Sequence, residues 1–307
     1  MPALRVRAQM PTALGAVAGL LVFGLTHSSL VDDAYITLTY GRTLGLHGEW
    51  GMYPGLPSNT ATSPLNVLLL GAGTAVTGDA MAGLGVLVVV IFALAGHWLD
   101  GLGRMLRIPR WRAPMLGIAF LGTSPLLLST VGLESYLAVT LMLGLAHYTV
   151  AGRRWASGVL AGLLVLTRPD LAVVSLVGVL AGGRNGWRVA VSAAGTALPW
   201  FVLSWLWLDS AVPDTMLLKA GLTWGQWNYG TGVLLWQPIF PSAVILSVLP
   251  AAIGLLALPF WIRSRVRPVG LVLGVGALAH GAAFLMIGTA PFHWGTTPRW
   301  WAGSVCF

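Results

Sequence analysis

Long stretches without charge recur along the chain, and short segments between them carry nearly all of its charged residues. A helix needs about 20 residues to cross the hydrocarbon of a bilayer, at about 1.5 Å per residue. The pattern therefore predicts an all-α polytopic membrane protein with nine spans, at residues 11–31, 80–99, 113–133, 135–152, 155–168, 170–183, 189–208, 241–262 and 268–289. The fifth and sixth stretches are short, so they are expected to tilt little, to thin the bilayer, or to let Arg153, Arg154 and Arg184 snorkel towards water.

The start of the chain is similar to a signal peptide, because Arg5 and Arg7 precede a long apolar run. That run covers about 20 residues, more than the 7–15 apolar residues of a typical signal peptide. We therefore interpret residues 11–31 as a retained first span.

A tenth apolar run, residues 61–77, could either cross the bilayer or lie along its outer surface. If it stays outside, the cytoplasmic segments hold most of the 17 basic residues: Arg5, Arg7, Arg104, Arg107, Arg110, Arg112, Arg153, Arg154, Arg184, Arg188, Arg263, Arg265 and Arg267. All but Asp100 of the nine acidic residues then lie outside. A crossing at 61–77 would put the arginines from Arg104 onward outside, against the positive-inside rule. The charges thus predict a cytoplasmic amino terminus and place the apolar run 61–77 along the outer surface of the membrane.

The composition supports a membrane protein and excludes several other classes of protein and kinds of site. The chain is 56% hydrophobic and only 8% charged, whereas soluble domains carry about a quarter of their residues as charges. Its net charge of +8 follows the predicted loops and so indicates orientation rather than a nucleic-acid partner. Cys306 is the only cysteine, which excludes an intrachain disulfide and a cysteine-based zinc site. Phosphate-loop, HExxH and nucleophile-elbow motifs are missing from the sequence.

Two predicted outer segments, residues 32–79 and 209–240, are long enough to form a structure of their own. Both are rich in aromatic residues: Trp50, Tyr53, Trp224, Trp227, Tyr229 and Trp236. Such rings suit the headgroup level of a bilayer, and they could equally form a platform that binds sugar or lipid. The sequence leaves both interpretations open.

Asp32 and Asp33 directly follow the first span and are the first candidate for chemistry. They open the segment 34–40, whose pattern fits a strand as well as a helix. One interpretation is a cap and a favourable charge at a helix start. The other is a general base that takes a proton from an attacking hydroxyl. The side chains of adjacent residues on a helix point about 100° apart, so we do not expect Asp32 and Asp33 to have the same role.

Other ionisable residues fall on the same predicted side. Glu134 lies at the outer junction of spans three and four, and Arg168 and Asp170 lie at the outer junction of spans five and six. They could end helices as simple ion pairs or build a site. The outer cations are Arg42, Arg168, Lys219 and Arg299, and they suit a phosphate as well as ordinary ion pairs. We interpret His97, His147 and His280, on separate spans, as packing or snorkelling residues.

The ordered set of outer motifs resembles the polyprenyl-phosphate-sugar glycosyltransferases of the GT-C fold, and most closely the actinobacterial terminal arabinofuranosyltransferases of the cell wall. The matching segments cover nearly the whole chain: Asp32-Asp33-Ala34-Tyr35-Ile36, Thr62-Ser63-Pro64-Leu65, Gly132-Leu133-Glu134, Leu166-Thr167-Arg168-Pro169-Asp170, Pro213-Asp214-Thr215 with Lys219, and Pro291-Phe292-His293-Trp294. Two features depart from the family. Gly295 and Thr296 stand where relatives have tyrosines, and relatives continue through further spans and often an outer soluble domain. Residues 1–307 are thus expected to form a single transmembrane domain without those parts.

The resemblance implies membrane-parallel helices in the first outer loop and a plasma-membrane enzyme active on its outer face. Asp32 or Asp33 would be the catalytic base, with Glu134 and Asp170 in the surrounding charge network. Cations would hold the donor phosphate: Arg168, Lys219 and His293, to which we add Arg299. Some relatives use a divalent cation, for which Asp33 and Glu134 are the candidates here. The implied donor is a polyprenyl-phosphate sugar, such as a pentose, and the acceptor a cell-envelope polysaccharide or glycolipid.

Two other classes of function stay open at this point. A catalytically silent subunit that binds lipid or glycan fits the shorter chain. A transporter or flippase fits less well, because transporters place ionisable residues near the membrane midplane, and the predicted spans have no Asp, Glu, Lys or Arg at their centres.

Overall fold

The computed structural model describes residues 2–109, 111–216, 230–232, 237–263 and 267–287, and these residues are all-helical, as the sequence predicts. Within them no β-strand forms, and a single β-bridge joins Tyr53 to Leu56. The first half contains α1 (Pro2–Thr26), α2 (Asp32–His47), α3 (Pro64–Thr77), α4 (Ala80–Met105), α5 (Arg112–Thr123), α6 (Pro125–Leu128) and α7 (Ser135–Val150). The second half contains α8 (Arg154–Thr167), η1 (Pro169–Leu171), α9 (Ala172–Ala181), η2 (Gly183–Asn185), α10 (Gly186–Leu208), α13 (Pro241–Arg263), α14 (Arg267–Val269), the π-helix η3 (Gly270–Val275) and α15 (Gly276–Ile287).

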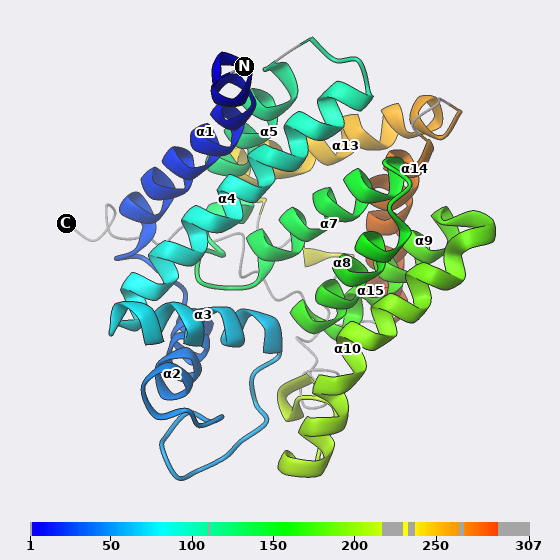
Figure 1. The fold of residues 1–307 in the computed structure, drawn as a ribbon. Helices are drawn as coiled ribbons and strands as arrows, with labels where there is room; N and C mark the ends of the chain where they lie inside the picture. The colour runs from blue at the N-terminus through cyan, green and yellow to red at the C-terminus, as the bar shows by residue number, and fades with distance from the viewer. Residues whose placement is uncertain (1, 110, 217–229, 233–236, 264–266, 288–307) are drawn as a thin grey trace.

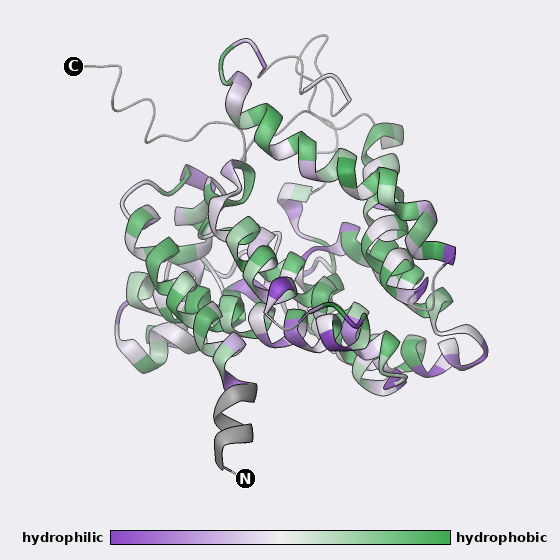
Figure 2. Ribbon diagram, turned by 90° about the horizontal axis from the view of Figure 1, so that it is seen from above, coloured by the Kyte–Doolittle hydropathy of each residue, from purple (hydrophilic) through white to green (hydrophobic). Residues whose placement is uncertain are grey.

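Five helical stretches in the described part of the chain are long and apolar enough to cross a membrane: Gln9–Thr26, Ala80–Met105, Gly183–Leu208, Pro241–Arg263 and Arg267–Met286. Apolar residues run along most of their length, and polar residues gather in the turns and at helix ends (Figure 2). Much of this apolar surface faces outward, since only 6% of the Pro241–Arg263 window is buried inside the protein. These helices indicate a membrane protein.

The remaining predicted spans coincide with helices that are shorter. The third is broken at Ser124-Pro125 into α5 and α6, because a proline cannot continue the hydrogen bonds of a preceding helix. Helices α7, α8 and α9 have 16, 14 and 10 residues. Nine crossings therefore stay a prediction, whereas helices at all nine positions are observed.

The first predicted outer segment folds into two helices at one end of the molecule. Residues 34–40 belong to α2, which resolves the choice between strand and helix. Residues 64–77 form α3, which lies across the end where α4 begins (Figure 1). Gly41 and Gly45 of α2 approach Leu70 and Gly71 of α3 closely enough that an added Cβ would collide.

The two predicted outer segments meet at this end. The buried Asn59 amide donates to Ser204 Oγ (3.2 Å), and to the Ser210 and Val212 carbonyl oxygens (2.8 and 3.4 Å). The backbone carbonyl of Asn59 accepts a hydrogen bond from the backbone N–H of Asp214 at 2.9 Å. Trp50 packs on Trp200 of α10 with ring centroids 4.3 Å apart. The two predicted outer segments are therefore in direct contact through Asn59 and Thr60.

Small residues bring the long helices together. Gly15 and Gly19 of α1 face the backbone of α4, where an ideal Cβ would lie 2.1 Å from Phe92 O and 2.9 Å from Val88 O. The same spacing recurs in α8, where Gly158 and Gly162 face α10. Glycines four residues apart allow this close approach and are typical of helix packing in membranes.

Substitution of Gly158 by alanine is expected to destabilise the fold by about 1–3 kcal/mol, since overpacking forces the backbone to move. A Cβ there would lie 2.4 Å from Ser192 Cβ and 2.5 Å from Val189 O. The matched control is Gly195→Ala on α10, where a Cβ meets nothing within 4 Å. That control should be neutral or stabilising by up to about 1 kcal/mol, because alanine favours helix. Thermal unfolding midpoints in detergent check both; equal midpoints for the two variants would disprove this packing.

Candidate functional site at the α2 end of the bundle

Four ionisable side chains from three separate parts of the chain form one connected network, which we call the Arg168 network: Glu134, Arg168, Asp170 and His280. Arg168 Nη1 donates to Glu134 Oε1 at 3.1 Å, and its Nε donates to Asp170 Oδ1 at 2.9 Å. His280 Nε2 lies 2.7 Å from Asp170 Oδ2. The network therefore joins the start of α7, the turn between α8 and α9, and the middle of α15.

Local backbone chemistry places the arginine and its two carboxylates. Pro169 restricts the residue before it to extended conformations, and Arg168 has φ −156° and ψ 128°. This extended conformation ends α8 at Thr167. Glu134 is the N-cap residue of α7, and its carbonyl accepts the Ala138 N–H at 2.8 Å. Both carboxylates are thus held at helix boundaries, where the chain changes direction.

The four side chains of the Arg168 network differ in how far they are exposed to solvent. The side chain of Glu134 is 9% exposed, that of Asp170 18%, that of His280 24% and that of Arg168 37%. Phe284, one turn along α15 from His280, lies beneath the arginine, with its ring centroid 6.0 Å from Arg168 Cζ. Arg168 is thus the most exposed member of the network, and Glu134 the most buried.

Neighbouring polar and charged groups keep the carboxylate of Asp170 ionised in the turn between α8 and α9. Burial alone would raise the pKa of Asp170, but the hydrogen bond with His280 and the charge of Arg168 lower it to about 2. Burial likewise opposes the charge on Arg168, and Glu134 and then Asp170 raise its pKa above the ordinary value. Because the pKa of Asp170 is depressed from about 4 in an unfolded chain, its contribution to stability is complete at neutral pH and is lost as the pH falls from about 4 through 2.

Asp32 and Asp33 occupy the first turn of α2, after the N-cap residue Val31. They are therefore where the helix dipole favours negative charge, as one interpretation of the sequence expects. Asp32 is exposed and Asp33 is half-buried. The general-base interpretation stays a prediction.

Gly132 connects this acidic turn with the Arg168 network. It packs on Ala34, the residue after Asp33, so closely that an ideal Cβ at position 132 would lie 2.8 Å from Ala34 Cβ. Its carbonyl accepts a hydrogen bond from Asn66 Nδ2 of α3 at 3.3 Å. Glu134 follows two residues later. The starts of α2, α3 and α7 therefore meet within a few residues of the candidate carboxylates.

Alanine at position 132 is expected to loosen this junction. Gly132 has φ +92°, a left-handed conformation that costs other residues about 1–2 kcal/mol, and the overlap with Ala34 adds about 1–3 kcal/mol. Gly152→Ala is the control, because Gly152 has φ +71° but open space around its Cα. Thermal unfolding should therefore show a clearly larger loss for Gly132→Ala. Equal losses would mean that the contact with Ala34 contributes nothing.

The other predicted site residues have different outcomes. Lys219, His293 and Arg299 lie outside the described residues. Glu134, Arg168 and Asp170, which the sequence assigned to a charge network and to phosphate binding, are in direct contact. Glu134 accepts a hydrogen bond from the Arg168 guanidinium, and the described residues contain no group of three or more metal-ligating side chains. A divalent cation on Asp33 and Glu134 stays a prediction.

His280 is the member of the network that the sequence does not reveal, since its place in a span indicates packing or snorkelling. One signal was present: an ionisable residue inside a predicted span is expected to have a polar partner and a function. His97 and His147, the other two span histidines, have ring centroids 6.4 Å apart, so those two do pack near each other.

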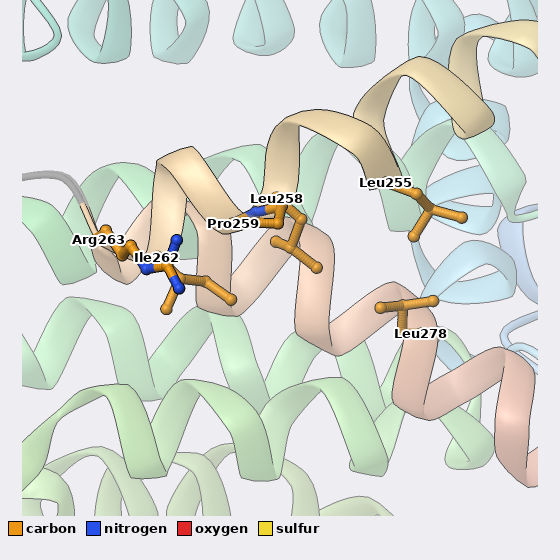
Figure 3. A pocket seen from close by; sticks show the side chains of 6 residues that line it. All are labelled: Leu255, Leu258, Pro259, Ile262, Arg263 and Leu278. Atoms are coloured by element: carbon orange, nitrogen blue, oxygen red, sulfur yellow. The ribbon is translucent and has the colours of Figure 1, made fainter.

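An apolar pocket of about 340 Å³ opens between α13 and α15 (Figure 3). Leu255 and Leu278 face each other at one end of it, and Ile262 and Arg263 lie at the other. Leu278 precedes His280 by two residues on α15. The pocket is large enough for part of a hydrocarbon chain.

Searches among family models, curated proteins and solved structures found no match to this chain.

Proposed function

We propose that this protein is a membrane glycosyltransferase of the GT-C type, which moves a sugar from a polyprenyl-phosphate donor to a cell-envelope glycan. A pentose such as arabinofuranose is the proposed sugar. The observation that carries the proposal is the convergence of the acidic first turn of α2, the Gly132 junction and the Arg168 network at one end of the bundle. An acidic base and a cation at the same end of a membrane-embedded bundle suit a reaction with a lipid-phosphate leaving group.

The proposed reaction is a single displacement at the anomeric carbon. Asp32 or Asp33 takes the proton from an acceptor hydroxyl, whose oxygen bonds to the anomeric carbon. The bond from that carbon to the phosphate oxygen breaks, and polyprenyl phosphate leaves with the electron pair. No oxidant, reductant or nucleotide is required.

Arg168 is the described residue best placed to meet the departing phosphate. It is partly exposed, and its hydrogen bonds to Glu134 and Asp170 use Nη1 and Nε. The two carboxylates fix the orientation of the guanidinium and reduce its net charge, so it would supply a directed hydrogen bond more than a strong field. Lys219, His293 and Arg299 would supply further positive charge.

The proposed orientation follows the charge pattern. Nine crossings place the amino terminus in the cytoplasm and the α2 end on the outer face of the plasma membrane, with α2 and α3 lying parallel to the surface. The apolar pocket between α13 and α15 offers a place for part of the polyprenyl chain.

The test is reconstitution of the full chain in liposomes with radiolabelled polyprenyl-phosphoryl pentose and an oligosaccharide acceptor. The proposal predicts transfer of label to the acceptor, lost in the double variant Asp32→Asn with Asp33→Asn. Donor binding without transfer would instead identify a silent binding subunit. Movement of label across the bilayer without transfer would identify a transporter.

A further inference from the structure

A second polar site lies at the opposite end of α8 from Arg168, where α8 and α10 begin. A pocket of about 370 Å³ opens there, lined by Gly152, Arg153, Arg154, Trp155, Ala156 and Arg188. Helix α8 has 14 residues, so about 21 Å of helix separates this pocket from the Arg168 network. The proposed transfer reaction makes no use of it.

The arginines that line the pocket form no ion pair with a carboxylate in the described part of the chain. Three guanidinium groups line it, and in the described part of the chain the arginine–carboxylate pairs are those of Arg104 and Arg168. Arg154 Nη1 donates to the Thr149 carbonyl at 3.2 Å, and Arg188 Cζ lies 5.4 Å from the Trp187 ring centroid. The amino-terminal ends of α8 and α10 add further positive potential. The chemistry therefore suits a phosphate group.

The surroundings of the pocket are those of a lipid rather than a soluble anion. Trp155 and Trp187 flank it, 53% and 56% exposed, with ring centroids 6.1 Å apart. Ser192 Oγ donates to the Trp155 carbonyl at 2.9 Å and so ties the two helices together. One turn further along the same helix faces, Val159 and Val191 are 42% and 55% exposed. The positive pocket thus continues into an exposed apolar surface.

We propose that this pocket binds the phosphate headgroup of an anionic membrane lipid, such as a phosphatidylglycerol. Arg153, Arg154 and Arg188 hold the phosphate, the two tryptophan rings lie at the headgroup level, and the acyl chains run beside Val159 and Val191. Basic pockets between membrane helices are suited to such headgroups. By the charge pattern, the lipid belongs to the cytoplasmic leaflet.

The test is native mass spectrometry of the purified full chain with phosphatidylglycerol or phosphatidylcholine of identical acyl chains. We expect tighter retention of the anionic lipid and a loss of about 100-fold in its affinity for the triple variant Arg153→Gln, Arg154→Gln, Arg188→Gln, at about fivefold per arginine. The single variant Arg153→Gln, whose side chain is exposed, should lose about fivefold and covers the case in which the triple variant fails to fold.

The control triple Arg104→Gln, Arg107→Gln, Arg112→Gln removes the same charge from another predicted cytoplasmic segment. Its affinity should fall less than about threefold, because surface charge alone acts diffusely. Equal losses in both triples would overturn the proposal in favour of general surface attraction. Displacement of the lipid by equimolar inorganic phosphate would overturn it in favour of a soluble anion.

Discussion

If the proposed transfer reaction uses Asp32 or Asp33 as its base, substitution of that aspartate by asparagine is expected to lower sugar transfer by about 100- to 10,000-fold, the usual contribution of general-base catalysis. Asparagine keeps the size of the side chain but cannot take a proton. Because adjacent side chains on α2 point about 100° apart, the other single variant should lose less than about tenfold. Initial rates with saturating lipid donor and glycan acceptor measure both.

Asp79→Asn is the matched control for this pair. Asp79 lies in the turn between α3 and α4, at the same end of the bundle, and its carboxylate caps α4 by accepting the Ala82 N–H at 2.8 Å. Asparagine caps a helix as well as aspartate does, so transfer should stay within about twofold of wild type. Full transfer by both Asp32→Asn and Asp33→Asn would remove the α2 aspartates from the mechanism.

Removal of the arginine at the centre of the network, in Arg168→Ala, is expected to destabilise the fold by about 2–3 kcal/mol. It would leave the carboxylates of Glu134 and Asp170 partly buried without their shared cation, and breaking a buried pair costs about 3–5 kcal/mol. The expected loss of stability is smaller than that of a fully buried pair because the Arg168 side chain is 37% exposed and solvent screens part of the interaction. Thermal unfolding in detergent at neutral pH measures the loss.

Two further variants distinguish the network from a general effect of charge. Arg104→Ala removes an exposed partner of Asp100 one helical turn away, which should cost no more than about 0.5 kcal/mol. The double variant Arg168→Ala with Glu134→Gln should be more stable than Arg168→Ala alone, because the most buried carboxylate is then neutral. Equal unfolding midpoints for Arg104→Ala and Arg168→Ala would contradict the described geometry.

The sequence predicts where the helices lie better than it predicts which helices pack together. Apolar runs report where a chain can be helical, so all nine predicted spans coincide with helices. Their lengths were overestimated at 113–133 and 170–183, since Ser124-Pro125 interrupts the first and α9 has only 10 residues. The segment after Asp33 was ambiguous because its pattern fits both periods, and its packing on α3 through Gly41 and Gly45 selects the helix.

The candidate site was predictable in its residues but not in its contacts. Glu134 and Arg168 are 34 positions apart, and Asp170 and His280 are 110 apart. Such pairs depend on how each helix is rotated about its own axis, which a list of spans does not determine. The bonds of Asn59 to residues 204–212 were hidden for the same reason.

The most direct test of the account is the sidedness of single cysteines towards a membrane-impermeant maleimide, in intact cells and with Cys306 replaced by serine. Asp32→Cys and Ser135→Cys report on the two halves of the site, and Arg107→Cys and Asn185→Cys report on the opposite face. The account predicts that positions 32 and 135 react from outside, whereas 107 and 185 react only after the membrane is opened. Reaction of positions 32 and 135 from opposite sides of the bilayer would contradict a shared site.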